Sequence, residues 1–485
     1  MRFEKRRVLE SVGLGALSFG ALLLHGYHPG AEDAEIYLPG VLKQLHPSLF
    51  PYGSQFFQSH AGMTLYPGLI ATSIRLSHLQ EGVAILTWHA IAILLTLTAC
   101  FRIARMCFRE SYAAWCGTAM IASLLTLPVA GTALYIMDPY LTARSLSTPV
   151  ALFALGSLLA GSYLSAALLT LLVAALHPLM SVFVIGWAGI LVVLRYRQRV
   201  AAIAPALGAF VLFPAVTPLY REILKTRPYF LLTNWAWYEW LGIFAPLVLL
   251  AWFARIAREH DFGPLDLVCQ ASVGLTIVCL GLELVIGVPG RFENFSELQL
   301  MRCLHLVYIL LFLLGGALLG EFVLRKHAVR WLVLFLPICA VMFLAQRLLF
   351  PASEHLEWPG SERRNPWVQA FRWVRGNTPQ DAYFALDPHY TSLPKADEQG
   401  FRAVARRSMM ADANKDAGAV SMFPLLAQQW ERQVTARRGW RSFVLSDFER
   451  LKDDYQVGWV IVTQPGVSGL ACPYQNSAVL VCRIP

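Results

Sequence analysis

The chain contains a succession of long apolar stretches, and this feature limits its possible folds more than any other. A helix that crosses a bilayer needs about 20 mostly apolar residues, and a soluble core does not need runs of that length. We find about eleven such stretches. They lie near residues 8–24, 83–101, 111–129, 147–161, 163–178, 180–194, 201–218, 241–255, 266–287, 303–323 and 331–350. The sequence therefore predicts a polytopic α-helical membrane protein.

The low charge content points the same way. Only 15% of the residues are charged and 56% are hydrophobic, whereas a soluble protein carries about a quarter charged residues. This composition excludes a soluble enzyme, a disordered protein and a nucleic-acid-binding domain. The net charge of +9 comes largely from short segments between apolar stretches, where Lys and Arg set membrane orientation. We therefore expect a lipid bilayer, and no nucleic acid, as partner.

The positions of Lys and Arg also predict an orientation. They gather near residues 102–109, 195–199, 255–258 and 325–330, which places these segments and the N-terminus in the cytoplasm. A signal peptide begins in the same way as this chain, but no small-residue cleavage site follows, so we expect a retained first helix. An odd number of helices then places residues 351–485 outside. The expected location is the bacterial inner membrane, with a periplasmic C-terminal domain.

Charge density divides the chain into two expected domains. Residues 351–485 hold 30 of the 71 charged residues, about the density of a soluble protein. We expect residues 1–350 to form a transmembrane domain with a large first outer loop at 25–82, and residues 351–485 to form a small α/β domain. Helical patterns lie at 366–375, 423–434 and 446–453, and strand patterns at 382–386, 457–462 and 478–482. In the first outer loop, residues 36–45 and 63–79 have the two-faced spacing of interfacial helices.

Three carboxylates, those of Glu32, Asp33 and Glu35, follow the first apolar stretch directly. Neighbouring carboxylates repel one another, which raises the pKa of at least one of them. A carboxylate at a membrane surface can act as a general base toward a hydroxyl or an amine. The alternative is structural, because Asp33 could cap a helix that begins at Ala34 or the triplet could lie in a solvated loop.

Cationic side chains are expected on the same side of the membrane. Arg302 follows Gln299 at the outer end of the tenth helix, where it either contacts a ligand or extends to the interface. Arg144 precedes the fourth helix and either contacts a ligand or closes its loop by pairing with Asp138. A loop further along forms either a basic rim or a solvated segment, and it contains Arg221, Lys225 and Arg227.

Histidines and cysteines complete the set of candidates. Three histidines could line a cavity or serve a structural role, namely His28, His60 and His177. Their spacing predicts no metal site, and no Cys/His zinc pattern is present. Cys472 and Cys482 flank an expected hairpin. In an oxidising compartment they could form a disulfide, with free thiols as the alternative.

The layout resembles the GT-C superfamily of membrane glycosyltransferases, which includes protein O-mannosyltransferases and lipid A aminoarabinose transferases. Members combine many transmembrane helices with a large first outer loop, and often with an outer C-terminal domain. They carry an acidic pair just after the first helix, which Glu32-Asp33 matches. The chain lacks the tryptophan- and aspartate-rich C-terminal motif of oligosaccharyltransferases. It looks nearer to uncharacterised bacterial polytopic members than to any branch of defined activity.

The resemblance implies an enzyme of the cell envelope that uses a polyprenyl-phosphate-linked sugar donor at the outer face. The acceptor would be a glycan, a lipid or a protein. Asp33 would deprotonate the acceptor, with Glu35 or Glu32 assisting. The leaving lipid phosphate needs a cation, for which Arg302 is the first candidate and Arg144 the second, with Gln299 beside them. Some members use a divalent cation and others do not, so the resemblance leaves this cofactor open.

Two other classes of function remain as alternatives. A transporter or flippase would move a lipid-linked or hydrophilic substrate, but transporters often show internal repeats and charged groups at mid-membrane. Here the ionisable residues gather at the outer ends of the helices, which favours chemistry at the interface. A non-catalytic scaffold of an envelope-polysaccharide system would keep the fold without the activity.

Overall fold

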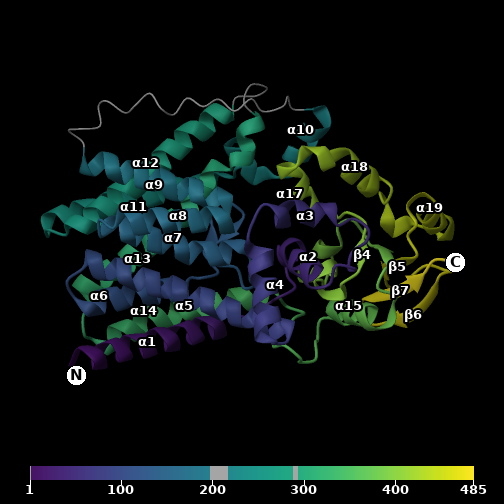
Figure 1. The fold of residues 1–485 in the computed structure, drawn as a ribbon, viewed down its shortest axis with the longest axis horizontal. Coiled ribbons are helices and arrows are strands. Elements are labelled where there is room, and N and C mark those ends of the chain that lie inside the picture. The colour runs from purple at the N-terminus through teal and green to yellow at the C-terminus, as the bar shows by residue number, and fades with distance from the viewer. Residues whose placement is uncertain (1, 197–216, 288–292) are drawn as a thin grey trace.

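The computed structural model describes residues 2–196, 217–287 and 293–485, which form a long helical bundle and a smaller part with a β-sheet (Figure 1). The N-terminus lies at the end of the bundle that is far from the sheet, and the C-terminus lies in the sheet-containing part (Figure 1). This is the expected fold class, a polytopic helical membrane protein with a small C-terminal sheet domain.

The bundle is built from helices that coincide with the expected apolar stretches. They are α1 (Arg2–His25), α5 (Glu81–Cys107), α6 (Ser111–Ser123), α7 (Ala143–Leu159), α8 (Tyr163–Leu176), α9 (Pro178–Arg195), α11 (Trp237–Glu259), α12 (Gly263–Ile286), α13 (Leu304–Leu319) and α14 (Ala328–Leu349). Within the described residues, 7 spans are long and apolar enough to cross a membrane, and α6, α7 and α8 are shorter. The expected stretch at 201–218 lies almost entirely outside the described residues.

Burial separates the centre of the bundle from its surface. The span that contains α13 is 67% buried and the α14 span only 6% buried, so α13 lies inside the bundle and α14 faces outward. At Gly117 of α6, an added Cβ would lie 2.4 Å from the carbonyl oxygen of Leu313 on α13. Small residues let membrane helices approach closely because no side chain separates the backbones.

Three helices connect α1 to α5 and lie between the bundle and the C-terminal part (Figure 1). They are α2 (Ala34–Leu45), α3 (Gln55–Gly62) and α4 (Tyr66–Ser77). The expected interfacial helices correspond to α2 and α4, whereas α3 was not expected. Val41 of α2 and Ile70 of α4 belong to one apolar cluster with Leu146 of α7. These helices therefore pack on the end of the bundle.

The C-terminal part contains a five-stranded sheet in the order β4-β3-β5-β7-β6. The strands are β3 (Tyr383–Ala385), β4 (Ser408–Met409), β5 (Trp459–Thr463), β6 (Ala471–Gln475) and β7 (Val479–Arg483). β3 is parallel to β4 and β5, and β7 is antiparallel to β5 and β6. The helices are α15 (Pro366–Asn377), α16 (Phe401–Ala405), α17 (Lys415–Met422), α18 (Ala427–Thr435) and α19 (Leu445–Tyr455). Separate apolar clusters involve α15 and α19, so the sheet packs against side chains on both faces.

Short backbone contacts join the segment after α1 to the C-terminal part. The main-chain N–H of Glu32 donates to the oxygen of Glu398 at 2.9 Å, and that of Gly400 donates to Gly30 at 2.7 Å. The remaining regular elements are α10 (Pro218–Lys225) and a hairpin of β1 (Pro128–Val129) and β2 (Leu134–Tyr135). The hydrogen bonds with Glu398 and Gly400 hold the segment that carries the three carboxylates against the residues just before α16.

The cysteines divide between the two parts of the chain. Cys472 on β6 and Cys482 on β7 form a disulfide, as the hairpin reading allowed. The other cysteines are free and belong to the bundle, where only Cys339 is more than slightly exposed.

Candidate functional site

A cavity of about 450 Å³ lies where the bundle meets the C-terminal part. Its walls come from the start of α2, the end of α3, the loop before α7, the α8–α9 junction, the segments after α10 and before α13, and α17. Most of the residues expected to be functional line it, namely Glu32, Asp33, His60, Arg144, His177, Gln299 and Arg302. Glu35 and His28 are not among the lining residues.

Asp33 lies at the start of α2, but its side chain makes no capping hydrogen bond. It points instead to Lys415 of α17, whose Nζ lies 3.1 Å from Oδ1. Burial alone would raise the pKa of Asp33, but the nearby charges of Lys415, Arg144 and Arg302 outweigh burial and hold the pKa well below its usual range. The carboxylate is therefore ionised at neutral pH. Asp33 does not cap α2 through its side chain, which was the structural alternative.

The pKa of Glu32 is shifted in the opposite direction to that of Asp33. Its backbone has a positive φ of 49°, and its Oε2 accepts a hydrogen bond from the Tyr140 hydroxyl at 3.3 Å. Burial raises the pKa of Glu32 to about 7, and the carboxylates of Glu398 and Asp33 add to the rise against the effect of Lys415. The cavity thus contains one carboxylate that is ionised throughout the neutral range and one that titrates within it.

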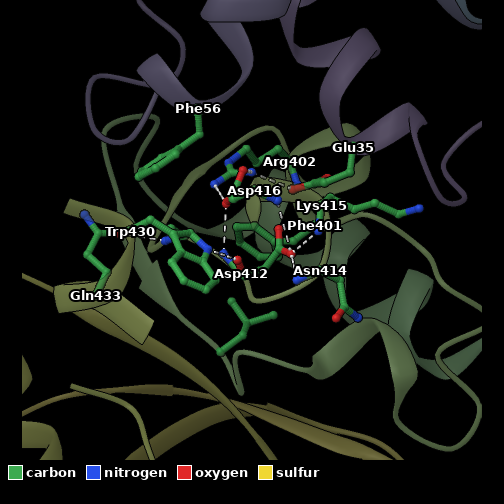
Figure 2. Close-up of polar contacts among 12 residues, drawn as sticks. Glu35, Phe56, Phe401, Arg402, Asp412, Asn414, Lys415, Asp416, Trp430 and Gln433 are labelled. Atoms are coloured by element: carbon green, nitrogen blue, oxygen red, sulfur yellow. Dashed lines mark hydrogen bonds and ion pairs between the residues drawn. The ribbon is translucent and has the colours of Figure 1, made fainter. Parts of the chain in front are cut away.

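Glu35 does not line the cavity, and its carboxylate points toward Arg402 of the C-terminal part (Figure 2). It is fully buried, and its Oε1 accepts from Nη1 of Arg402 at 3.3 Å. It also accepts from the main-chain N–H groups of Arg402 and Ala403, each at 3.1 Å. An added Cβ at Gly400 would lie 2.4 Å from Glu35 Oε2, so this contact requires glycine. The assisting role expected for Glu35 has no geometric basis here, because its carboxylate is occupied by structural partners.

The same arginine fixes the start of α17, which presents Lys415 (Figure 2). Arg402 donates to both carboxylate oxygens of Asp416 at 3.0 and 2.7 Å. Asp412 accepts from the main-chain N–H groups of Asn414 and Lys415. Burial lowers the pKa of Lys415, but Asp33 and the neighbouring glutamates outweigh burial and raise it. Lys415 is therefore a charged group held at the cavity wall.

Arg144 lines the cavity but already has a partner. Its Nη2 lies 2.6 Å from Asp138 Oδ2, and both side chains are buried. Thr142 also donates to that carboxylate at 3.3 Å. The structure thus shows the Asp–Arg bridge that the sequence offered as the alternative for Arg144.

Arg302 and Gln299 keep free hydrogen-bonding capacity. The Arg302 guanidinium lies 5.3 Å from the centre of the Tyr229 ring. Its Nε is buried without a hydrogen-bond partner among the described residues. Gln299 donates to Met422 Sδ at 3.2 Å, and its Oε1 is likewise buried and unpartnered within the described part of the chain. Buried polar groups are normally paired, so these atoms indicate a site for a polar ligand.

Arg227 adds a second arginine to this wall. Its Nε and Nη2 are buried without a hydrogen-bond partner in the described ranges. The sequence placed it in a basic rim or a solvated loop, and the structure places it in the cavity lining. Arg221 and Lys225 of the same rim do not line the cavity and are exposed.

Lys415 lines the cavity, but the sequence analysis gave it no role. No local pattern around it indicated one.

The three candidate histidines separate into two groups. His28 pairs with Glu357 at 2.9 Å and stacks on the Phe350 ring with centroids 3.9 Å apart, outside the cavity. His60 and His177 line the cavity, and the Nδ1 of each is buried without a partner among the residues described. Burial lowers the pKa of His60 to about 4, so this ring is a neutral hydrogen-bonding group.

The residues around Asp33 do not fit a resident divalent cation. The Lys415 ammonium lies 3.1 Å from Asp33 and 3.8 Å from Glu398, and a cation bound to Asp33 would need that position. Within residues 2–196, 217–287 and 293–485, no group of three or more His, Cys, Asp or Glu side chains could hold a metal ion.

Comparison with known proteins finds similarity among solved structures only. No protein-family model and no curated protein matches the chain. The chain is similar to the Archaeoglobus fulgidus oligosaccharyltransferase in its apo form, with 12% identity over 93% of this chain and 69% of that chain and a TM-score of 0.45. It is also similar to the archaeal oligosaccharyltransferase AglB from Archaeoglobus fulgidus in complex with an inhibitory peptide and a dolichol-phosphate. The identity is 12% over 96% of this chain and 70% of that chain, with a TM-score of 0.45. Because the identity is only 12%, this similarity assigns no role to individual residues, and the geometry of the cavity is the basis for such roles.

Proposed function

We propose that the chain is a glycosyltransferase that moves a sugar from a polyprenyl-phosphate-linked donor to an acceptor at the membrane surface. One observation carries the proposal: a single cavity contains the ionised carboxylate of Asp33 together with Arg227 and Arg302, whose buried N–H groups have no partner among the described residues. A base and an anion-binding group in one cavity are what transfer from a phosphate leaving group requires.

The reaction would be a direct displacement with inversion. The acceptor hydroxyl or amine loses its proton to the Asp33 carboxylate as its oxygen or nitrogen bonds to the anomeric carbon of the sugar. The bond between that carbon and the phosphate oxygen breaks, and both of its electrons go to the polyprenyl phosphate. Negative charge therefore grows on the phosphate, where a preorganised cation lowers the barrier.

Arg302 and Arg227 are the proposed phosphate-binding residues. Leaving a buried N–H unpaired is costly, and phosphate oxygens would pair both guanidinium groups in the forked geometry that arginine provides. Arg144 is assigned a different role. Because Asp138 already neutralises it at 2.6 Å, Arg144 supports the cavity wall and adds positive potential.

Lys415 would link donor binding to the basicity of Asp33. While the ammonium pairs with Asp33 at 3.1 Å, the carboxylate is a weak base because its pKa is held low. A donor phosphate offers Lys415 a second anion. As the ammonium moves toward this anion, the pKa of Asp33 rises and the carboxylate can accept a proton. Ionised Glu32 assists because a neighbouring negative charge makes Asp33 more basic.

The apolar lining fits a lipid-linked donor. Ile36, Leu179 and Val182 line the same cavity as the charged groups, and the last two belong to α9, a helix long and apolar enough to span a membrane. A polyprenyl chain could lie along α9 while its phosphate reaches the arginines. The proposed acceptor is a glycan, a lipid or a protein, and the proposed location is the periplasmic face of a bacterial inner membrane.

The test separates binding from chemistry in protein reconstituted in nanodiscs. Binding of undecaprenyl phosphate measures the leaving-group site without knowledge of the sugar, and transfer is measured with radiolabelled lipid-linked sugars extracted from the host membranes. We expect R302A to weaken binding of undecaprenyl phosphate at least about tenfold, as loss of a charge-assisted hydrogen bond does. D33N should keep this binding and lose transfer by about 100-fold or more.

R221A is the matched control, because Arg221 is exposed on α10 and does not line the cavity. It should bind and transfer like the wild type. Transfer that persists in D33N would remove Asp33 as the base, and wild-type protein that binds undecaprenyl phosphate no better than R302A would contradict the phosphate site. If the wild type binds undecaprenyl phosphate but transfers none of the lipid-linked sugars in the extract, the result would favour the alternative of a non-catalytic scaffold.

A further inference from the structure

A second and larger cavity of about 910 Å³ lies at the other end of the bundle. It is lined by the first half of α1, the last turns of α5 and α7 and the start of α8. α1 begins at this end, far from the C-terminal part (Figure 1), and its 24 residues correspond to roughly 36 Å of helix. The second cavity is therefore separate from the proposed donor site.

The polar lining of this cavity is cationic and rich in hydroxyl groups. Its charged side chains are three arginines and one glutamate, namely Arg7, Arg102, Arg105 and Glu10. Five hydroxyl groups line it as well, those of Ser11, Thr98, Ser157, Ser162 and Ser165. Guanidinium and hydroxyl groups together are the donors that bind phosphoryl oxygens.

Two of the arginines lack an anionic partner. The Arg102 guanidinium lies 5.5 Å from the centre of the Phe153 ring, a cation–π contact that leaves its N–H groups available. Neither the Arg102 side chain nor the Arg105 side chain forms a hydrogen bond or ion pair with any residue in the described ranges. Arg102 and Arg105 are one turn apart on α5, so both face the same side of that helix.

The remaining lining is apolar and continues onto the outer surface of α1. Leu14, Phe101 and Leu152 line the cavity, and Val8 and Leu9 of α1 are 61% and 70% exposed beside it. In a membrane protein, exposed apolar side chains at this position face lipid chains. Exposed apolar side chains of α1 thus lie close to the cationic cavity, so a molecule with an anionic headgroup and apolar chains fits this region better than a free inorganic anion.

We propose that this cavity binds the phosphoryl headgroup of an anionic phospholipid, with Arg102 and Arg105 as its main contacts and the acyl chains along α1. Basic pockets between membrane helices bind such headgroups because each basic residue near the bilayer surface attracts anionic lipid. The site is independent of the donor cavity and of the reaction proposed there.

The test is native mass spectrometry of the purified, delipidated full-length protein with defined lipids. The probes are phosphatidylglycerol, phosphatidylcholine as the neutral lipid, and inorganic phosphate. We expect the wild type to retain one phosphatidylglycerol in preference to phosphatidylcholine. R102Q/R105Q should weaken this retention at least about tenfold, and R102K/R105K should keep most of it because the charges remain.

The matched control is R255Q/R258Q, which removes two charges at the same end of the bundle without changing the lining of the cavity. This variant should retain phosphatidylglycerol like the wild type. Equal loss in both glutamine variants would show a general charge effect and overturn the proposal. Equal retention of the two lipids by the wild type would also overturn the proposal. The same holds if the wild type retains inorganic phosphate as strongly as it retains phosphatidylglycerol. If R102Q/R105Q does not fold, the single variants R102Q and R105Q provide the same comparison.

Discussion

Glu32 and Asp33 are adjacent carboxylates in one cavity, yet their charges respond differently to pH. Burial raises the pKa of Glu32 to about 7, so Glu32 is ionised above this pH and neutral below it. Because ionised Glu32 increases the basicity of Asp33, we expect transfer activity to fall as the pH drops through about 7. The measurement is the pH profile of kcat/KM, which reports groups of the free enzyme.

The variant E32Q tests the origin of this pH dependence. Glutamine keeps the shape of the side chain and does not titrate, so the change in activity near pH 7 should disappear and the rate should stay low at every pH. An E32Q profile with the same inflection as the wild type would assign the titration to another group.

Lys415 is expected to act on donor binding and on rate together. Replacement by methionine removes the ammonium that lies 3.1 Å from Asp33 and leaves a side chain of similar length. We expect K415M to raise the KM for the donor and to lower kcat by about 100-fold, because the leaving phosphate loses a stabilising cation and this loss outweighs the higher basicity of Asp33. K395M is the control, because Lys395 is exposed and lies outside the cavity lining. Unchanged kinetics in K415M would leave Lys415 with a structural role only.

The sequence could place Asp33 and Arg302 in one site because each lies at the end of an apolar stretch, and ends on the same side of a membrane lie close together. It could not separate Asp33 from Glu35. Residues two positions apart at the start of a helix point to different sides, so Glu35 faces Arg402 and not the cavity. Lys415 is 382 positions from Asp33, and only the folded chain brings them together.

At the scale of elements, the buried Arg402 of α16 links Glu35 of α2 to Asp416 of α17. The side chains of Arg402, Glu35 and Asp416 are 1% exposed or less. Breaking a buried charged network by removing one partner costs about 3–5 kcal/mol, since the other charges stay buried without compensation. We expect R402M to lower the thermal unfolding temperature of the purified protein and to weaken undecaprenyl phosphate binding, because α17 would no longer hold its part of the cavity wall.

R438M is the matched control for this element. Arg438 is exposed in the turn that follows α18, so its replacement should leave both measurements unchanged. R402M protein that melts like the wild type would show that the network adds no stability. R402M protein that melts early but binds undecaprenyl phosphate normally would show that α17 is positioned by its other contacts.

The elements themselves could be predicted to different degrees. The apolar sequence at 147–194 is nearly continuous, yet its expected divisions near 162 and 179 are confirmed: the structure divides it at Gly161, which has a φ of 76°, and at Pro178, where α9 begins. Glycine permits that backbone conformation, and proline is favoured at the first position of a helix. The helices α3 and α17 have 8 residues each. Helices this short owe their stability to tertiary packing, and a local sequence pattern therefore does not identify them.

At the scale of the whole molecule, the two cavities lie at opposite ends of the bundle, so their environments depend on how the chain crosses the membrane. The positive-inside pattern predicts that the Arg102–Arg105 cavity lies at the cytoplasmic face and the Asp33 cavity outside. The disulfide between Cys472 and Cys482 agrees with this arrangement, because disulfides persist in oxidising compartments. Orientation therefore determines which lipids and which acceptors can reach each cavity.

Labelling of single introduced cysteines in intact cells tests this orientation. Asp453 is exposed on α19 in the C-terminal part, and His327 is exposed just before α14 at the other end of the bundle. We expect a membrane-impermeant maleimide to label D453C in spheroplasts and to label H327C only after lysis. The native free cysteines give little background because all except Cys339 are buried, and C339S removes that one. Labelling of H327C alone before lysis would reverse the orientation and place the proposed transfer site in the cytoplasm, where the Cys472–Cys482 disulfide would not persist.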